Sequence, residues 1–221
     1  MLGKLLLICG ILSSLLYAAM NIFIPMLWEE YSSASQTVSE LSAIGAPTRV
    51  VWVPLGLLYT LLIAAFGLGV RKSAGEIRSL RIAGSLLIVY GLVGLAWPPM
   101  HLRETLAAGG GTITDTLHIV FTMITVPLML LVMGFSSAAF GKTFRIYSIS
   151  TIVIQLFFGI LTGIDSPGIQ TNEPTPLIGV WERICIGAYM LWLVVFAVML
   201  LRADVESQKK ITKQSARILS G

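Results

Sequence analysis

Six long apolar runs alternate with short polar segments along the chain, and each run is long enough to cross a bilayer. A membrane-spanning helix needs roughly 20 mostly apolar residues. Because hydrocarbon has no water to satisfy an open sheet edge, segments of this kind cross it as helices. The pattern therefore predicts an all-α, polytopic membrane bundle of six transmembrane helices. The predicted spans cover residues 5–27, 51–70, 80–97, 117–135, 146–164 and 177–201.

The composition agrees with a membrane protein and leaves no room for a soluble domain. The chain of 221 residues is 56% hydrophobic and only 12% charged, and its mean hydropathy is +0.86. A soluble domain needs more charge to cover its surface. We therefore expect a single transmembrane domain over residues 1–201 and a basic cytoplasmic tail over residues 202–221. Membrane lipids are the expected partners, and no nucleic-acid partner is expected.

The basic residues predict the orientation of the bundle. All but three of the 15 Lys and Arg residues lie on the side of the two termini, and the exceptions are Arg49, Arg103 and Arg183. By the positive-inside rule, both termini are cytoplasmic and the protein is a multi-pass protein of the cell membrane. Most acidic residues and both histidines, His101 and His118, lie on the outer side. Residues suited to metal binding or proton transfer are therefore concentrated on one face.

The first outer loop contains the sequence TVSE, which fits a capping box. In that motif Thr37 caps a helix and Glu40 reaches back to a free backbone N–H. We therefore expect a short interfacial helix over residues 38–44. Glu40 is then either a cap or a carboxylate that a lid segment brings over the mouth of the bundle. Ser39 is either part of the helix surface or a group that stabilises negative charge.

The second outer loop ends in a glycine-rich turn and a second capping box, TITD. Asp115 lies in the first turn of the following helix, where a carboxylate interacts favourably with the helix dipole. His118 is three residues further on and shares a helix face with Asp115. The two residues are either a cap and a hydrogen-bonded histidine, or an imidazole oriented by Asp115 that acts as a base or a metal ligand.

The third outer loop adds further charged groups. Asp165 follows Gly159 and Gly163, whose GxxxG spacing is a weak sign of close helix packing, and it is either a turn residue or a nearby carboxylate. Glu182 and Arg183 lie at the start of the last apolar run. Because adjacent residues on a helix point about 100° apart, these two need partners on other helices. Arg183 would meet Asp115, Asp165 or a bound anion.

Several of these segments resemble one known family. The sequence YSSASQTVSELSAIGAP before a span, WPP before a loop, a histidine opening the next span and ERI in the last span are similar to the six-span prokaryotic membrane proteins of domain-of-unknown-function family 998. The resemblance implies the six-span architecture for nearly the whole chain, but its name implies no activity. Relatives tend to have Asp where this chain has His101, and a second His where it has Asp115. The residues that fall on the motif positions of the family are Tyr31, Ser32, Gln36, Ser39, Glu40, Pro47, His118 and Arg183.

The sequence is compatible with several functions at the outer face. The first is binding of a lipid headgroup or a small polar ligand, in a sensor or lipid-organising accessory role. Its expected ligand-binding residues are Arg183, Glu182, Arg103, Asp165, Tyr31 and Gln36. The second is hydrolysis of a lipid-like substrate, with Asp115, His118, Ser39 and Glu40 as catalytic residues. The third is transport of a small solute, and a purely structural role is the fourth.

The hydrolase would work with or without a metal ion. Zinc is the candidate cofactor, and its expected ligands are His101, His118 and Asp115. In both forms of the site, Glu40, Asp115, His118 and Arg183 are expected to converge at the outer mouth of the bundle.

Overall fold

Every element is a helix in residues 2–219, the part of the chain that the computed structural model describes; side chains are described for residues 2–203. The predicted all-α class is therefore confirmed. The elements in chain order are α1 (Leu2–Phe23), η1 (Ile24–Leu27), η2 (Val38–Ser42), α2 (Arg49–Ser73), α3 (Arg78–Leu95), α4 (Arg103–Ala107), α5 (Ile113–Ser137), α6 (Lys142–Asp165), α7 (Pro167–Thr171) and α8 (Ile178–Leu219).

Six helices of the described chain are long and apolar enough to span a membrane, which confirms the predicted number. They cover Leu2–Leu27, Arg49–Ser73, Arg78–Leu95, Ile113–Ser137, Lys142–Thr171 and Ile178–Ala203. Most of these helices extend beyond the predicted apolar runs because polar residues form their first and last turns. The backbone of α8 continues as one helix past residue 201 to Leu219, and the side chains of residues 204–221 in the predicted basic tail lie outside those described.

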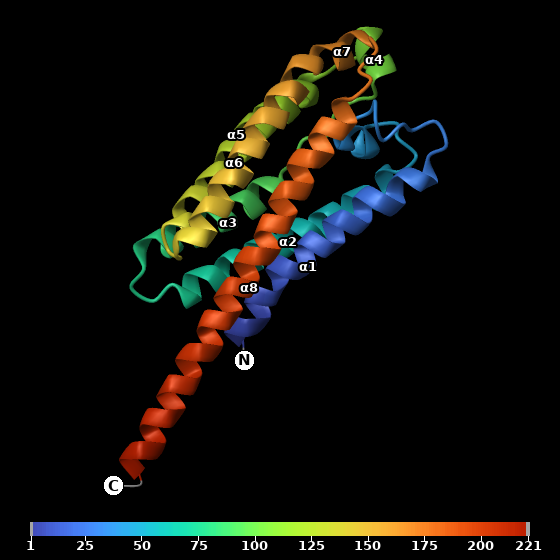
Figure 1. Cartoon of the computed structure of the whole chain (residues 1–221). Coiled ribbons are helices and arrows are strands. Elements are labelled where there is room, and N and C mark those ends of the chain that lie inside the picture. Colours follow the sequence, from blue (N-terminus) through green and yellow to red (C-terminus); the bar gives the residue numbers. More distant parts are fainter. Residues whose placement is uncertain (1, 220–221) are drawn as a thin grey trace.

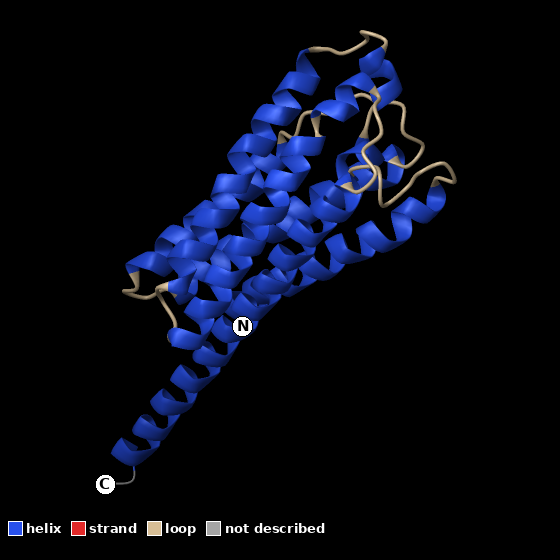
Figure 2. Ribbon diagram, turned by 45° about the horizontal axis from the view of Figure 1, so that its top comes forward, coloured by secondary structure: helices blue, strands red, loops and turns tan. Residues whose placement is uncertain are grey.

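The six long helices form a closed ring in which each helix packs against the next one along the chain. The contacts run from α1 to α2, α3, α5, α6 and α8, and α8 returns to α1. Figures 1 and 2 show this bundle, with the start of α1 and the end of α8 at the same end. The loops that contain η2, α4 and α7 lie together at the opposite end, which we call the distal end.

The interior of the ring is filled by aliphatic side chains and by a group of aromatic ones. Phe66, Tyr189, Trp192 and Phe196 are fully buried there. Large apolar side chains on the outer faces of the helices are exposed, as expected where lipid is the solvent. The helices α2 and α3 touch through their backbones, since a Cβ atom on Gly67 would lie 2.7 Å from the Gly84 carbonyl oxygen. The predicted close packing at Gly159 and Gly163 is not formed within the described chain, because no atom lies within 4 Å of a Cβ at either position.

Candidate functional site

The distal end is built around the loop that joins η1 to α2. Its 3-10 helix η2 begins with the predicted capping box, in which both the Thr37 and the Glu40 contacts are formed. The helix ends at Ser42, two residues before the predicted end at Ile44. Ile44 instead forms an isolated bridge with His101, and its N–H donates to the Met100 carbonyl oxygen at 2.7 Å. The first and second distal loops are therefore joined by their backbones.

Glu40 is fully buried and forms a two-point ion pair with Arg103 of α4. The Arg103 Nε and Nη2 atoms donate to the two carboxylate oxygens at 2.8 and 2.9 Å. The Thr37 N–H and hydroxyl donate to the same carboxylate at 2.8 and 3.0 Å. These hydrogen bonds from Arg103 raise the pKa of its guanidinium above the ordinary value, so Arg103 is a permanent cation. Glu40 is therefore both a cap and the anchor of a second loop.

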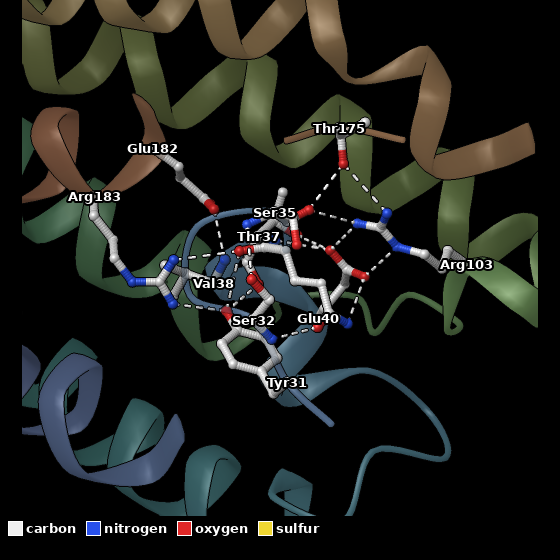
Figure 3. A network of polar contacts seen from close by, with 11 residues as sticks. Tyr31, Ser32, Ser35, Thr37, Val38, Glu40, Arg103, Thr175, Glu182 and Arg183 are labelled. Atoms are coloured by element: carbon white, nitrogen blue, oxygen red, sulfur yellow. Dashed lines mark hydrogen bonds and ion pairs between the residues drawn. The ribbon is translucent and has the colours of Figure 1, made fainter. Parts of the chain in front are cut away.

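Arg103 extends the network to the third distal loop, as Figure 3 shows. Its Nη1 donates to the Thr175 hydroxyl at 3.2 Å, and its Nη2 donates to the Ser35 carbonyl oxygen at 3.2 Å. The Thr175 hydroxyl also donates to the Ser35 carbonyl at 2.8 Å. One guanidinium thus connects three segments that are far apart in the sequence.

A second guanidinium, Arg183 of α8, holds the start of the loop. It donates to the Ser33 carbonyl oxygen at 2.7 Å. It also donates to the Tyr31 hydroxyl at 2.7 Å and lies over the Tyr31 ring (Figure 3). The Tyr31 hydroxyl donates in turn to the Thr37 carbonyl at 2.8 Å. Burial raises the pKa of Tyr31 to about 12, so the hydroxyl keeps the proton that this bond needs.

Two neighbours of Arg183 complete the attachment of the loop to α8. The Glu182 carboxylate accepts a hydrogen bond from the Val38 N–H at 2.6 Å, at the first residue of η2. The Gly179 N–H donates to the Ala34 carbonyl at 2.9 Å. A Cβ atom on Gly179 would lie 2.5 Å from the Ser33 carbonyl oxygen, so only glycine lets the loop approach this closely. Sequence reasoning missed Gly179, although it lies one helical turn before Arg183.

Asp115 contacts His101 rather than the histidine on its own helix. One of its carboxylate oxygens accepts the His101 N–H at 2.7 Å, and the other lies 2.9 Å from His101 Nδ1. The same carboxylate completes the predicted capping box at the start of α5 with Thr112. The Asp115 carboxylate thus caps α5 and also holds the second distal loop through His101.

His118 lies one turn deeper in α5 and is 6% exposed. Its Nδ1 lies 2.8 Å from the Pro98 carbonyl oxygen, and its Nε2 lies 3.1 Å from the Ser39 hydroxyl. The Trp97 ring packs edge-on against the imidazole at 5.2 Å. The sequence suggested that Asp115 orients the imidazole and that a metal ion binds it. In the structure the two ring nitrogens contact the Pro98 carbonyl and the Ser39 hydroxyl instead.

The side chains of the four residues that were expected to converge do not bond to one another in the part of the chain that is described. Glu40, Asp115, His118 and Arg183 all lie at the distal end, but each has a different partner. Asp165 is the last residue of α6 and, within the described chain, it has no hydrogen bond or ion pair with them. Among residues 2–203, no three His, Cys, Asp or Glu side chains gather closely enough to hold one metal ion. Zinc binding by His101, His118 and Asp115 stays a prediction that lacks a preformed three-ligand site.

An open hollow of about 500 Å³ lies where the first distal loop enters α2. Arg49 is its charged residue, and the Nη1 atom of Arg49 donates to the Ser42 carbonyl at the end of η2. The sequence identified Arg49 as an outer-face cation but did not include it in the site. The lining residues are Ala46, Pro47, Arg49, Val50, Val53 and Pro54.

Comparison with known proteins shows which family the chain represents. No curated protein and no solved structure matches it. A family model described as "Protein of unknown function (DUF998)" matches residues 11–199, which include all six spans in whole or in large part and every distal loop. The resemblance noted in the sequence is therefore confirmed, and the chain belongs to the DUF998 family of proteins of unknown function.

Proposed function

We propose that this protein is an integral membrane protein that binds an anionic phospholipid at its extracytoplasmic side, with the lipid phosphate at Arg49. The observation that carries the proposal is the hollow at the start of α2, which combines one cation with an otherwise apolar lining. Val50, at its edge, is 77% exposed on a helix that is apolar enough to span a membrane. A molecule that fills such a hollow has an apolar part and an anionic end.

A phospholipid satisfies both requirements from within the membrane. Its acyl chain would pack along Val50, Val53 and Pro54, which continue from the hollow into the span. Its phosphate would accept charge-assisted hydrogen bonds from the remaining donors of the Arg49 guanidinium, since Nη1 already donates to the Ser42 carbonyl. A basic residue at the membrane surface contributes about 1 kcal/mol to the attraction of anionic lipid. Binding at one site is therefore selective but weak.

The residues that the sequence suggested as ligand contacts have an indirect role in this proposal. Arg103, Glu182, Arg183 and Tyr31 make their hydrogen bonds within the chain. They fix the loop that leads to Ala46 and Pro47 at the wall of the hollow. Because binding at one end of the bundle needs no path across it, the proposed role is that of a lipid sensor or a lipid-organising accessory protein.

The test is lipid binding by purified protein in detergent, with Arg49→Gln compared against Arg78→Gln. Arg78 is exposed at the other end of the bundle, so this control removes the same charge away from the hollow. Native mass spectrometry would count bound phosphatidylglycerol, and thermal unfolding would be measured with the same lipid, with phosphatidylcholine and with inorganic phosphate.

We expect phosphatidylglycerol to bind and to stabilise wild type and Arg78→Gln, and to bind Arg49→Gln about fivefold more weakly, with a correspondingly smaller stabilisation. Stabilisation by inorganic phosphate alone would show that the ligand is a free anion and not a lipid. Equal binding by the two variants, or equal stabilisation by phosphatidylcholine, would contradict the proposed site.

A further inference from the structure

Ser39 and His118 form a hydrogen-bonded pair of the kind that activates a serine. The Ser39 hydroxyl oxygen lies 3.1 Å from His118 Nε2, although the two residues are 79 positions apart in the sequence. A nucleophile and its base are normally found at about 2.6–3.2 Å. Ser39 is only half-buried in η2, whereas His118 is buried in α5. The base is thus shielded, whereas the residue that has the hydroxyl is partly exposed.

The contact on the other side of the ring determines how the pair is protonated. The Pro98 carbonyl oxygen, 2.8 Å from His118 Nδ1, has lone pairs and no proton, so Nδ1 carries the hydrogen. In the neutral imidazole Nε2 is then the acceptor, and the Ser39 hydroxyl donates to it. A backbone carbonyl thus has the orienting role that a carboxylate has in a Ser-His-Asp triad.

Both members of the pair are held by their surroundings. Trp97 packs against the His118 ring, and Pro98 follows it directly in the chain. Ser39 lies between two anchored residues of η2, since the Val38 N–H donates to Glu182 and the Glu40 carboxylate is paired with Arg103. The 3.1 Å contact therefore belongs to a site that is supported on both sides.

We propose that Ser39 is the nucleophile, and His118 the general base and acid, of an acyl-transfer reaction on the carboxylic ester of a membrane lipid. His118 is five residues after the first residue of α5, which is roughly 8 Å along the helix axis. The pair therefore lies just inside the distal end of a span, at the level where ester groups join headgroups to acyl chains. This inference stands on the Ser39–His118 geometry and does not depend on lipid binding at Arg49.

The reaction balances with water as the only co-reactant. The Ser39 oxygen attacks the ester carbonyl carbon, and its proton moves to His118 Nε2. The tetrahedral intermediate collapses with loss of the alcohol, which takes the proton from His118. Water then attacks the acyl-serine, gives its proton to His118, and releases the fatty acid as Ser39 recovers the proton. His118 is neutral at the start and at the end of the cycle.

An alkyl fluorophosphonate tests this chemistry, because the serine oxygen bonds to phosphorus as fluoride leaves. Detergent-purified wild type would be treated with the probe, and the modified residue would be located by mass spectrometry. We expect an adduct on Ser39. In His118→Asn, which keeps a donor for the Pro98 carbonyl but has no base at Nε2, labelling should fall about 100-fold or more. Ser137→Ala, at the other end of α5, should label as wild type does.

Ser39→Cys keeps the test valid if His118→Asn fails to fold. Paired with His118, the thiol should react with iodoacetamide at pH 7 at least about 10 times faster than a cysteine placed by Ser137→Cys, since an adjacent imidazole favours the thiolate. Both serines are half-buried in the native protein. Wild type that remains unlabelled at Ser39, labelling that is equal in folded His118→Asn, or equal alkylation of the two cysteines would each overturn the proposal.

Discussion

Arg103 holds both carboxylate oxygens of Glu40, at 2.8 and 2.9 Å, in a pair that joins the first and second distal loops. Glu40 is completely buried, and Arg103 is nearly so. Breaking a buried pair on one side leaves the remaining charge without compensation and typically costs about 3–5 kcal/mol, whereas its replacement by two apolar residues is often close to neutral. The two side chains are therefore expected to depend on each other strongly.

The first prediction is that Arg103→Met destabilises the protein more than Glu40→Met together with Arg103→Met. The single variant should lose about 3–5 kcal/mol of unfolding free energy. The double variant should lose mainly the cap at Thr37, about 1 kcal/mol. Thermal unfolding in one detergent measures both. A double variant that is less stable than Arg103→Met would show that Glu40 acts mainly through other partners.

The second prediction concerns the contact between α8 and the first loop. Gly179→Ala places a methyl group against the Ser33 and Gln36 carbonyl oxygens, so the loop must move and about 1–3 kcal/mol of stability should be lost. Gly187→Ala is the matched control on the same helix, because no atom lies within 4 Å of its Cβ position. The control should be stabilised by about 0.5–1 kcal/mol. Equal melting temperatures for the two variants would argue against close docking of the loop.

The third prediction is a pH dependence that comes from Tyr31. Burial raises the pKa of its hydroxyl to about 12 from an ordinary value of 10.0. Because the folded pKa lies above the unfolded one, the stability contributed by the protonated hydroxyl is complete below pH 10 and is lost as the pH rises towards 12. Tyr31→Phe should be less stable than wild type at pH 8, and the difference should shrink when melting is followed from pH 9 to 12. A constant difference would contradict this assignment.

The fourth prediction is the orientation that the basic residues indicate. Glu30 lies in the first distal loop and Glu76 between α2 and α3 at the opposite end, and both are exposed. In intact cells, a membrane-impermeant maleimide should label Glu30→Cys and should label Glu76→Cys only after the membrane is permeabilised. The parent chain with Cys9 and Cys185 gives the background. The reverse pattern would place both termini outside the cell.

Local sequence signals predicted the helices and the caps, because each depends on residues within one or two turns. The six spans follow from apolar length, and the capping boxes at Thr37 and Thr112 follow from spacing alone. The partners of the charged residues depend on how loops that are distant in sequence meet. No local pattern indicates that Arg103 pairs with Glu40. Nor does one indicate that Asp115 contacts His101, or that His118 contacts the Pro98 carbonyl.

Two further features had signals that were too weak to interpret. Gly179 is one of 21 glycines, and only the structure shows that a carbonyl oxygen fills the space where its side chain would be. Arg49 was recognised as a cation on the outer side, but its hollow is formed by Ala46 and Pro47 as they turn into α2. The close approach at Gly179 and the hollow at Arg49 both depend on the path of the backbone, which the residue type alone does not indicate.

The closure of the ring by α8 has a consequence for biosynthesis. A ribosome delivers the spans to the membrane in order, from the N-terminus onwards. Until the sixth span is released, the first loop has neither the Arg183 donors nor the Glu182 acceptor that hold it in the finished protein. A nascent chain that stops before α8 therefore leaves the Ser33 carbonyl and the Val38 N–H to water at the distal end. Arrival of the last helix closes the ring and attaches the first loop in the same step.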